Sequence, residues 1–311
     1  DSDYLLGVYD ETRLGGIRFK TDMNGAFLSD DKDTAAPPWA TLRTLEEASR
    51  NFENDDSGLS EKWLNQLIKP GSSLGGARPK ATVIDTDEQL WIAKFPSKND
   101  ENDTGAWEMV THNLAELCGL RVTEAKLEKF SALGSTYLVK RFDRILKKRV
   151  HFASAMTLLG KTDGASAVDG TSYLEMAAFI KSYGAQPKED LIELWRRIVF
   201  NMAVTNTDDH LRNHAFILTE TGWSLSPLYD VNPVPYGDEL SLNVNAEDNS
   251  ISVELAVETA VRFGISETDA KMYAKEILGI VRENWEKQAV RCGLTRRLIE
   301  EMRPAFRACY V

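Results

Sequence analysis

A polar stretch, residues 206–214 with the sequence NTDDHLRNH, carries the side chains best suited to chemistry. Asp208 and Asn213 stand five residues apart in it, as D-x-x-x-x-N. Phosphoryl transfer needs a carboxylate that orients the attacking hydroxyl and accepts its proton, and an amide oxygen that holds Mg²⁺. One short loop can offer both groups to one phosphate at this spacing. The pair is therefore a candidate for a catalytic base and a metal ligand.

Asp230 is a candidate for a second metal ligand. It comes seventeen residues after Asn213, in the sequence SPLYDVNP at the end of a predicted hairpin strand. Mg²⁺ takes oxygen ligands and usually keeps only one or two from protein carboxylates. Asp, Asn and Pro are also ordinary turn residues, so the spacing taken alone fits a plain exposed turn. The later Asp in its strand context favours the catalytic interpretation.

The front half supplies groups that could hold a nucleotide. The segment PGSSLGGARPK (70–80) can let backbone N–H groups approach phosphate oxygens, because Gly75 and Gly76 lack a Cβ, although an ordinary turn explains it as well. Lys94 lies in an apolar strand, and Glu108 lies on the helix that follows. Kinases use such a Lys–Glu pair on the ATP phosphates, whereas the simpler alternative is two solvent-facing charges. The order of the parts, from Gly-rich loop to final Asp, favours the kinase interpretation.

Hydrophobic periodicity predicts a β-rich front half and a mainly helical back half. We expect an α+β fold of two lobes, with a β-rich lobe over residues 1–142 and a helical lobe over residues 143–311. A cleft between two such lobes is a common place for a ligand. The predicted helices cover residues 42–52, 59–68, 107–117, 191–202 and 272–285, and the predicted strands cover residues 81–85, 90–95, 135–142, 214–218 and 223–226.

Composition limits the class of protein. A net charge of −11 argues against nucleic acid as a direct ligand, because phosphate-backbone binding needs a basic face. Hydrophobic residues make up 42% of the chain, enough for a sizeable core. Three scattered cysteines without CxxC spacing indicate a reducing compartment and no zinc site. No apolar run approaches the ~20 residues of a membrane span, so we expect a soluble cytoplasmic protein without a membrane partner.

Several stretches together resemble the HipA family, the kinase toxins of bacterial HipBA toxin–antitoxin systems. They occur in the family order over residues 3–233. The resemblance implies a two-lobed protein-kinase-like fold and a serine/threonine protein kinase that uses ATP and Mg²⁺. The matching stretches are DYLLGVYDETRLGGIRF (3–19), SSLGGARPKA (72–81), LWIAKFPS (90–97), YLVKRFDR (137–144), NTDDHLRNH (206–214) and LYDVNP (228–233).

The resemblance also implies roles for individual residues. Asp208 would be the catalytic base, with Asn213 and Asp230 as Mg²⁺ ligands and Lys94 on the ATP phosphates. His210 would contact the nucleotide or brace its loop. The remaining nucleotide-binding and regulatory positions are the hinge Lys140, Arg141 and Phe142 beside adenine, Asp143 at the ribose hydroxyls, Gly75 and Gly76 in the Gly-rich loop, and Ser73, with its neighbour Ser72, as the loop serine that is autophosphorylated to shut the enzyme off.

This sequence departs from the family pattern in three places. The Gly-rich loop reads GGARPK where the family more often has AGAQEK, and Asp209 stands where Gly is usual. Asp209 adds a negative charge beside the proposed base. Family members generally carry a further subdomain before the DYLLGV segment, so we expect either a split variant, in which a separate small protein supplies it, or a shortened chain.

The resemblance implies the partners as well. They are a helix-turn-helix, HipB-like antitoxin, through which DNA is contacted only indirectly, and a protein target in translation, an aminoacyl-tRNA synthetase. Two alternatives remain open. A small-molecule or lipid kinase shares the Asp, Asn and Asp constellation and would need a roomy acceptor pocket. A catalytically weak pseudokinase could instead serve as a scaffold for a transcriptional repressor, although the intact candidate residues argue against it.

Overall fold

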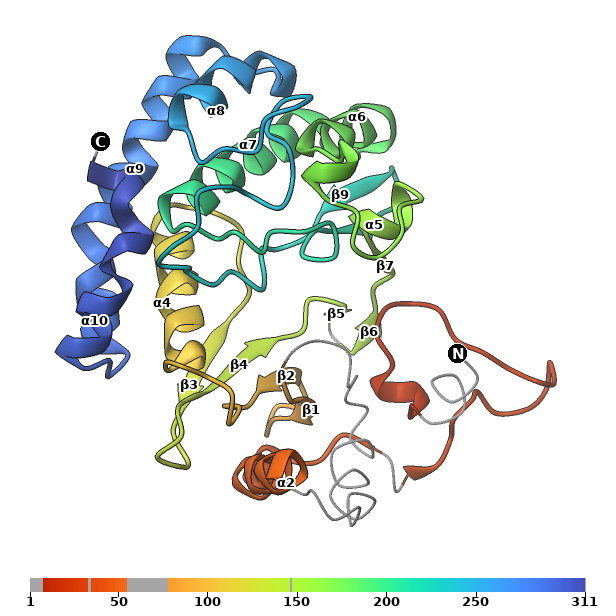
Figure 1. The fold of residues 1–311 in the computed structure, drawn as a ribbon. Coiled ribbons are helices and arrows are strands. Elements are labelled where there is room, and N and C mark those ends of the chain that lie inside the picture. Colours follow the sequence, from red (N-terminus) through yellow and green to blue (C-terminus); the bar gives the residue numbers. More distant parts are fainter. Residues whose placement is uncertain (1–7, 33–34, 55–77, 146, 311) are drawn as a thin grey trace. The chain divides into compact units, whose positions relative to one another are not determined.

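The computed structural model describes residues 8–32, 35–54, 78–145 and 147–310 (Figure 1). The chain forms two compact units: unit 1 is Asp1–Ala106 with Thr123–His151, and unit 2 is Trp107–Val122 with Phe152–Val311. This division differs from the expected boundary at residues 142 and 143. Residues 143–151 belong to unit 1 because Arg144 and Arg149 donate hydrogen bonds to backbone carbonyls of residues 13 and 15. Helix α4 (Thr104–Leu117) begins at the end of the first segment of unit 1, and its residues from Trp107 onward belong to unit 2.

Unit 1 is built on a four-stranded antiparallel sheet in the order β1-β2-β4-β3. The strands are β1 (Lys80–Ile84), β2 (Leu90–Lys94), β3 (Ala125–Glu128) and β4 (Thr136–Lys140). The β1–β2 hairpin and β4 confirm the strands predicted from the sequence. The predicted helix over residues 59–68 lies outside the described residues.

One face of this sheet packs against helix α2 (Leu42–Asn54). Successive side chains of a strand point to opposite faces, so every second residue enters this core. In β2 these are Trp91 and Ala93, whereas Lys94 is half-buried and lies on the other face. Trp39 meets Trp91 edge to face, with ring centroids 5.3 Å apart. A hydrogen bond of 2.6 Å from Thr136 Oγ1 to Glu46 Oε2 further joins α2 to the sheet.

The other elements that the structure describes in unit 1 are short. They are the 3₁₀ helices η1 (Asp10–Thr12) and η3 (Trp39–Thr41) and the strands β5 (Arg144–Ile145) and β6 (Lys148–Arg149), which pair as a hairpin. Lys147 in the hairpin turn has a positive φ of 67°. The hairpin lies where it does because its arginines bond the carbonyls of the 10–15 segment.

Unit 2 is mainly helical and carries a three-stranded sheet in the order β7-β8-β9. Its strands are β7 (Phe152–Ser154), β8 (Ala215–Leu218) and β9 (Trp223–Leu225). Its helices are α4 (Thr104–Leu117), α5 (Ala155–Leu158), η4 (Ala167–Asp169), α6 (Tyr173–Tyr183), α7 (Pro187–Ala203), α8 (Val253–Thr259), η5 (Ala260–Phe263), α9 (Glu267–Arg291), α10 (Arg296–Met302) and η6 (Arg303–Tyr310).

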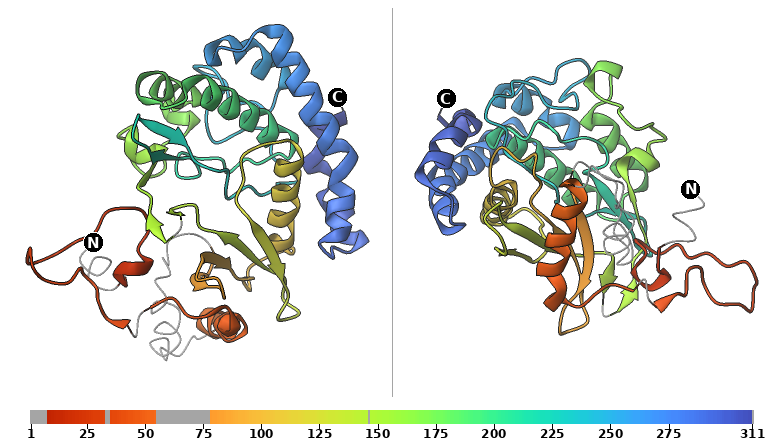
Figure 2. Two further views of the ribbon diagram at one scale, coloured as in Figure 1. Left: turned by 180° about the vertical axis from the view of Figure 1, so that it is seen from behind. Right: turned by 60° about the horizontal axis from the view of Figure 1, so that its bottom comes forward.

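The core of unit 2 lies around α7, which packs against α6, α8, α9 and η6 (Figure 2). Trp195 is fully buried, and its indole N–H donates to the carbonyl of Ala256 in α8 at 2.8 Å. Trp285 of α9 stacks on Phe306 of η6, with ring centroids 4.3 Å apart. The predicted helices of α4, α7 and α9 and the β8–β9 hairpin are thus confirmed, but Leu117 of α4 and Met272 of α9, which the sequence predicted on apolar faces, are exposed. Among the described residues, no helix is long and apolar enough to cross a bilayer.

Candidate active site

The segment after α7 forms a tight loop that brings Asp208 and Asn213 together. The backbone N–H of His210 donates to the carbonyl of Asp208, and that of Asn213 donates to the carbonyl of His210. The Asn213 side-chain amide also donates to the carbonyl of Asp208, at 2.9 Å. With its NH₂ group engaged in this bond, the amide of Asn213 is held in one orientation. The predicted five-residue spacing therefore closes into one loop.

Asp208 and Asp209 are neighbours with opposite environments. Asp208 is exposed, and its carboxylate accepts no hydrogen bond from any residue that the structure describes. Asp209 is 1% exposed, and its Oδ2 accepts hydrogen bonds from Tyr173 Oη at 2.6 Å, Asn201 Nδ2 at 2.7 Å and His214 Nε2 at 2.9 Å. The extra acidic residue thus points into the core of unit 2.

The electrostatics of this buried cluster fix its protonation. Burial alone raises the pKa of Asp209, but the charge and hydrogen bond of His214 and the Tyr173 hydroxyl outweigh it, so the pKa lies below its ordinary value. Burial and the Asp209 charge raise the pKa of Tyr173 well above its ordinary value. Asp209 is therefore an ionised acceptor at neutral pH, and Tyr173 is a neutral donor.

Asp230 lies in a segment that runs beside the loop of Asp208 and Asn213. Tyr229 Oη donates to the carbonyl of Arg212 at 2.8 Å, and the N–H of Val234 donates to the carbonyl of Thr205 at 3.1 Å. Burial, and then the charge of Asp230, raise the pKa of Tyr229, which keeps its hydroxyl a donor. Two hydrogen bonds on either side of Asp230 thus hold its segment against the loop of Asp208 and Asn213.

A row of amides continues this linkage. Asn201 donates to Asp209, its Oδ1 accepts from Asn206 Nδ2 at 3.1 Å, and Asn206 Oδ1 accepts from the N–H of Asn232 at 3.5 Å. The row joins α7, the loop of Asp208 and Asn213, and the Asp230 segment. Sequence reasoning missed it, because single Asn residues carry no pairing signal.

Two residues here have backbone conformations that L-residues seldom adopt. Thr205 has φ 49° and Asp230 has φ 61°. A β-branched residue at positive φ is a genuine outlier, and such strain costs about 1–3 kcal/mol where it persists. Thr205 is held by its hydroxyl, which donates to the carbonyl of Ala305 at 2.6 Å. Strain of this kind clusters at functional sites.

The donor set fits Mg²⁺ better than a softer metal. Asn213 and Asp230 offer one amide oxygen and one carboxylate, and Mg²⁺ is commonly held by one or two carboxylates with waters and phosphate oxygens. Among the described residues, no group of three or more His, Cys, Asp or Glu side chains could hold a metal ion. Zinc, which prefers nitrogen and sulfur ligands, does not suit this set.

His210 and Arg212 form the outer side of the loop. His210 Nε2 lies 3.2 Å from Arg212 Nη2, and Arg212 Nη1 pairs with Asp163 at 2.6 Å. The buried Nδ1 of His210 has no hydrogen-bond partner among the described residues. One nitrogen of His210 therefore contacts Arg212 of the same loop, and the other is buried.

In unit 1, Asp143 is the centre of a buried ionic cluster. It is 2% exposed and accepts from Arg141 Nε at 2.8 Å and Nη2 at 2.7 Å, from Arg144 Nη1 at 2.8 Å and from the Gly15 N–H at 2.7 Å. Burial raises the pKa of Asp143, but the two arginines and Gly15 lower it below its ordinary value. Arg141 Nη1 also donates to the carbonyl of Thr12 at 2.6 Å. Arg141 and Asp143 thus fasten the 12–15 segment to the end of β4.

The other predicted nucleotide-binding residues of unit 1 lie on its sheet. Lys94 ends β2, with its amine 5.9 Å from the ring centroid of Tyr137. Lys140 ends β4 and lies 3.8 Å from Glu124, and Phe142 follows half-buried. Glu108 is buried on α4 in unit 2, so its pairing with Lys94 stays a prediction. The Gly-rich-loop positions lie outside the described residues: Ser72, Ser73, Gly75 and Gly76.

Comparison with known proteins gives the fold and the family of the chain. A chain in the solved structure of the Shewanella oneidensis MR-1 toxin antitoxin system HipA, HipB and its operator DNA complex superimposes with a TM-score of 0.69 at 18% identity. The match covers 99% of this chain and 77% of that chain. The chain therefore has an α+β, kinase-like fold. The family model of the HipA-like C-terminal domain matches residues 72–285, more than half of the chain, which therefore belongs to that family.

Curated relatives carry kinase names. "Putative kinase Y4mE" of Sinorhizobium fredii is 27% identical over 232 residues, which are 66% of this chain and 50% of that protein. "Putative kinase" of Haemophilus influenzae is 28% identical over 194 residues, 54% of this chain and 56% of that protein. The chain thus spans about half the length of these curated relatives.

Proposed function

We propose that this chain is an ATP- and Mg²⁺-dependent serine/threonine protein kinase. The observation that carries the proposal is the convergence of the loop that holds Asp208 and Asn213 with the segment that holds Asp230. Three hydrogen bonds join these two stretches or their flanks. Such an arrangement offers a proton acceptor and two metal ligands to one phosphoryl group.

Asp208 is the proposed catalytic base. Its carboxylate is exposed and is not committed to any hydrogen bond with the described residues. It can therefore orient the hydroxyl of a serine or threonine and take its proton as the oxygen attacks phosphorus. Asp209 is not the base, because three donors occupy the Oδ2 oxygen of its buried carboxylate.

Asn213 and Asp230 are the proposed metal-holding residues. Mg²⁺, when bound, would supply positive charge at the phosphate oxygens as the transition state forms. The Asn213 amide is fixed by its bond to the Asp208 carbonyl, so its oxygen has a set direction. Asp230 lies at positive φ, a conformation in which most residues would be strained. The Asn213 amide is thus held in place before any ligand arrives.

Unit 1 would bind the nucleotide. We assign the α- and β-phosphates to Lys94, adenine to Lys140, Arg141 and Phe142, and nucleotide contact or loop bracing to His210. Asp143 can reach ribose hydroxyls only if one of its present donors releases it, since the carboxylate already accepts four hydrogen bonds. The Gly75–Gly76 backbone would contact phosphates, and Ser73 or Ser72 would be autophosphorylated.

The biological setting follows the family. We propose a toxin of a type II toxin–antitoxin system that inhibits translation by phosphorylating an aminoacyl-tRNA synthetase. Its partners would be a helix-turn-helix antitoxin and a separate small protein that resembles the front subdomain. A net charge of −11 fits DNA contact through the antitoxin alone. The solved relative, whose structure includes HipB and operator DNA, is the precedent.

The test is phosphoryl transfer by the purified chain. After incubation with Mg²⁺ and ATP, intact-mass and peptide mass spectrometry should find phosphate on Ser73 or Ser72, and none in Asp208→Asn. Glu220→Gln, which removes an exposed acid in the β8–β9 turn, is the matched control and should behave as the parent does. Transfer that survives in Asp208→Asn would refute the assignment. Bound ATP without transfer to the chain itself or to an added synthetase would favour the pseudokinase.

A further inference from the structure

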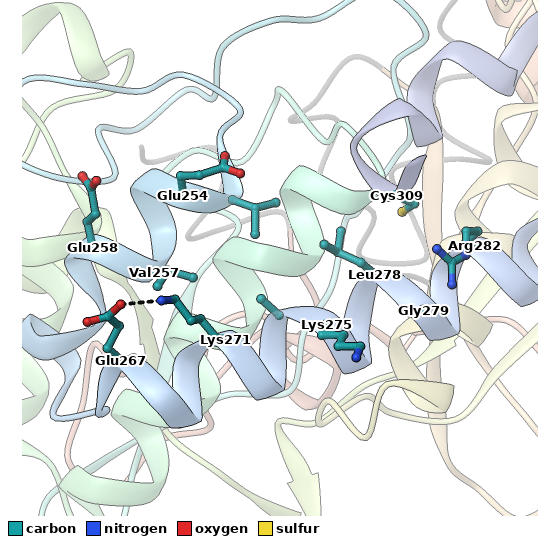
Figure 3. A pocket seen from close by; sticks show the side chains of 12 residues that line it. Glu254, Val257, Glu258, Glu267, Lys271, Lys275, Leu278, Gly279, Arg282 and Cys309 are labelled. Atoms are coloured by element: carbon teal, nitrogen blue, oxygen red, sulfur yellow. Dashed lines mark hydrogen bonds and ion pairs between the residues drawn. The ribbon is translucent and has the colours of Figure 1, made fainter. Parts of the chain in front are cut away.

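A groove in unit 2 lies outside every residue assigned above. It occupies about 500 Å³ between α8, α9 and the end of η6, a size typical of ligand-binding clefts (Figure 3). Its apolar lining includes Val253 and Val257 of α8, Leu278 of α9 and Cys309 of η6. The two valines and the leucine are half-buried, so apolar surface remains open to a partner.

Gly279 lies in the middle of α9 and lines the groove. A glycine inside a helix destabilises it by about 1 kcal/mol relative to alanine. Packing within the chain gives no reason for it, because a Cβ at Gly279 would meet no atom within 4 Å. The missing side chain instead leaves room for an occupant to approach the helix backbone closely.

Charged residues line the two edges of the groove. Glu254 and Glu258 stand one turn apart on α8, whereas α9 carries Lys275 and Arg282, two turns apart, beside the Lys271–Glu267 ion pair (Figure 3). Neither Lys275 nor Arg282 makes an ion pair with a residue that the structure describes. Lys275 and Arg282 are seven residues apart and therefore about 10.5 Å apart along the axis of α9. Residues i and i+7 of a second helix lying beside α9 would have the same spacing. An occupant with a matching row of charges could therefore meet both cations.

We propose that this groove binds an amphipathic helix of a partner protein. The helix places apolar residues at i, i+3, i+4 and i+7 over Val257, Leu278 and Gly279. It carries acidic residues along the flank that faces Lys275 and Arg282, and basic residues along the flank that faces α8. Apolar burial supplies most of the affinity, because exposed ion pairs each contribute little. The charges mainly set the direction in which the helix lies.

The probe is a labelled synthetic peptide helix with a leucine face, glutamates on one flank and lysines on the other, titrated against the whole chain by fluorescence anisotropy. Gly279→Leu fills the groove and should weaken binding by about tenfold or more. Lys287→Leu adds the same side chain at an exposed position of α9 outside the groove and should not change it. The Gly279→Leu chain should fold, since leucine favours a helix and its Cβ meets nothing.

Charge reversal tests direct contact. The double variant Lys275→Glu/Arg282→Glu should bind the glutamate-flanked peptide more weakly than the parent chain does. A peptide with lysines on both flanks should bind this double variant better than it binds the parent. No binding to the parent chain, or binding that Gly279→Leu leaves unchanged, would overturn the proposal. A concentration-dependent dimer that Gly279→Leu abolishes would assign the groove to a second copy of the chain and would also overturn it.

Discussion

Removing the carboxylate of Asp209 should destabilise unit 2 more than the small size of this group suggests. Asp209→Ala leaves three buried donors, on Tyr173, Asn201 and His214, without their acceptor. Each unsatisfied buried donor costs about 1–3 kcal/mol, and breaking a buried charged pair costs about 3–5 kcal/mol. Because the three losses share one cavity they are not additive. We expect a loss of about 3–5 kcal/mol in the free energy of unfolding of unit 2.

Asp209→Asn separates charge from shape. Its amide oxygen can occupy the Oδ2 position and still accept the three hydrogen bonds, so only the charge is lost. Hydrogen bonds to charged groups are stronger than neutral ones by about 1 kcal/mol, and we expect a loss of about 1–2 kcal/mol. The lowered pKa of Asp209 gives the sign, because it means that the fold favours the ionised carboxylate.

The assay is urea unfolding, monitored through the hydrogen exchange of peptides from α6 and α7. Because both helices belong to unit 2, their exchange reports the unfolding of unit 2 separately from that of unit 1. Asp238→Ala is the control, because it removes only an exposed ion pair with Arg307, worth about 0–1 kcal/mol. A loss below ~1 kcal/mol in Asp209→Ala would refute the reasoning, since buried unsatisfied donors cost at least that much. Equal losses in the Ala and Asn variants would refute the role of the charge.

The same cluster predicts a pH dependence. The pKa of Asp209 is lower in the folded chain than in the unfolded chain, where an aspartate has a pKa of about 3.9. Its ionised carboxylate therefore contributes its full stability above the unfolded pKa, and this stability is lost as pH falls through the folded pKa. The stability difference between the parent and Asp209→Asn should therefore be constant from about pH 5 to 7 and should shrink below about pH 4. A difference that grows on acidification would contradict the assignment.

Three further outcomes are expected. Asp230→Asn should change the unfolding free energy by under ~1 kcal/mol, because Asn tolerates positive φ, while phosphoryl transfer falls below detection in the mass assay. Tyr229→Phe should cost about 1 kcal/mol in urea unfolding by removing the bond to the loop carbonyl, and an unchanged midpoint would contradict this. Burial raises the pKa of Cys118 and of Cys309 to about 12, so iodoacetamide at pH 8 should label Cys292 first by peptide mass spectrometry, and equal labelling would contradict it.

The sequence predicted elements whose pattern is local. The alternation in LWIAKF and the apolar rhythm of α7 and α9 depend only on neighbouring residues, and these elements are present. The spacing of Asp208 and Asn213 was likewise a local signal, because one tight loop joins them. The division between units was harder, since the β5–β6 hairpin belongs with carbonyls more than 120 residues earlier in the chain.

The roles of neighbouring acids could not be predicted. Asp208 and Asp209 are identical in type, and the donors Tyr173, 36 residues away, Asn201 and His214 engage Asp209 in the core. His214, five residues after Asp209, was the one available signal. Asp143 was expected at a ribose, yet its carboxylate is engaged by Arg141 and by a backbone N–H 128 residues away. Long-range contacts of this kind leave no trace in spacing.

The most direct test of the account is calorimetric titration of ATP, with and without Mg²⁺, into the parent chain, Asp208→Asn and Asp230→Asn. If the loop and the Asp230 segment form one metal–nucleotide site, the parent and Asp208→Asn should bind ATP with the same Mg²⁺-dependent affinity. Asp230→Asn should lose the Mg²⁺-dependent part alone. Binding that ignores Mg²⁺ in the parent, or an Asp230→Asn variant that binds as the parent does, would contradict the assignment of Asn213 and Asp230 as the metal-holding pair.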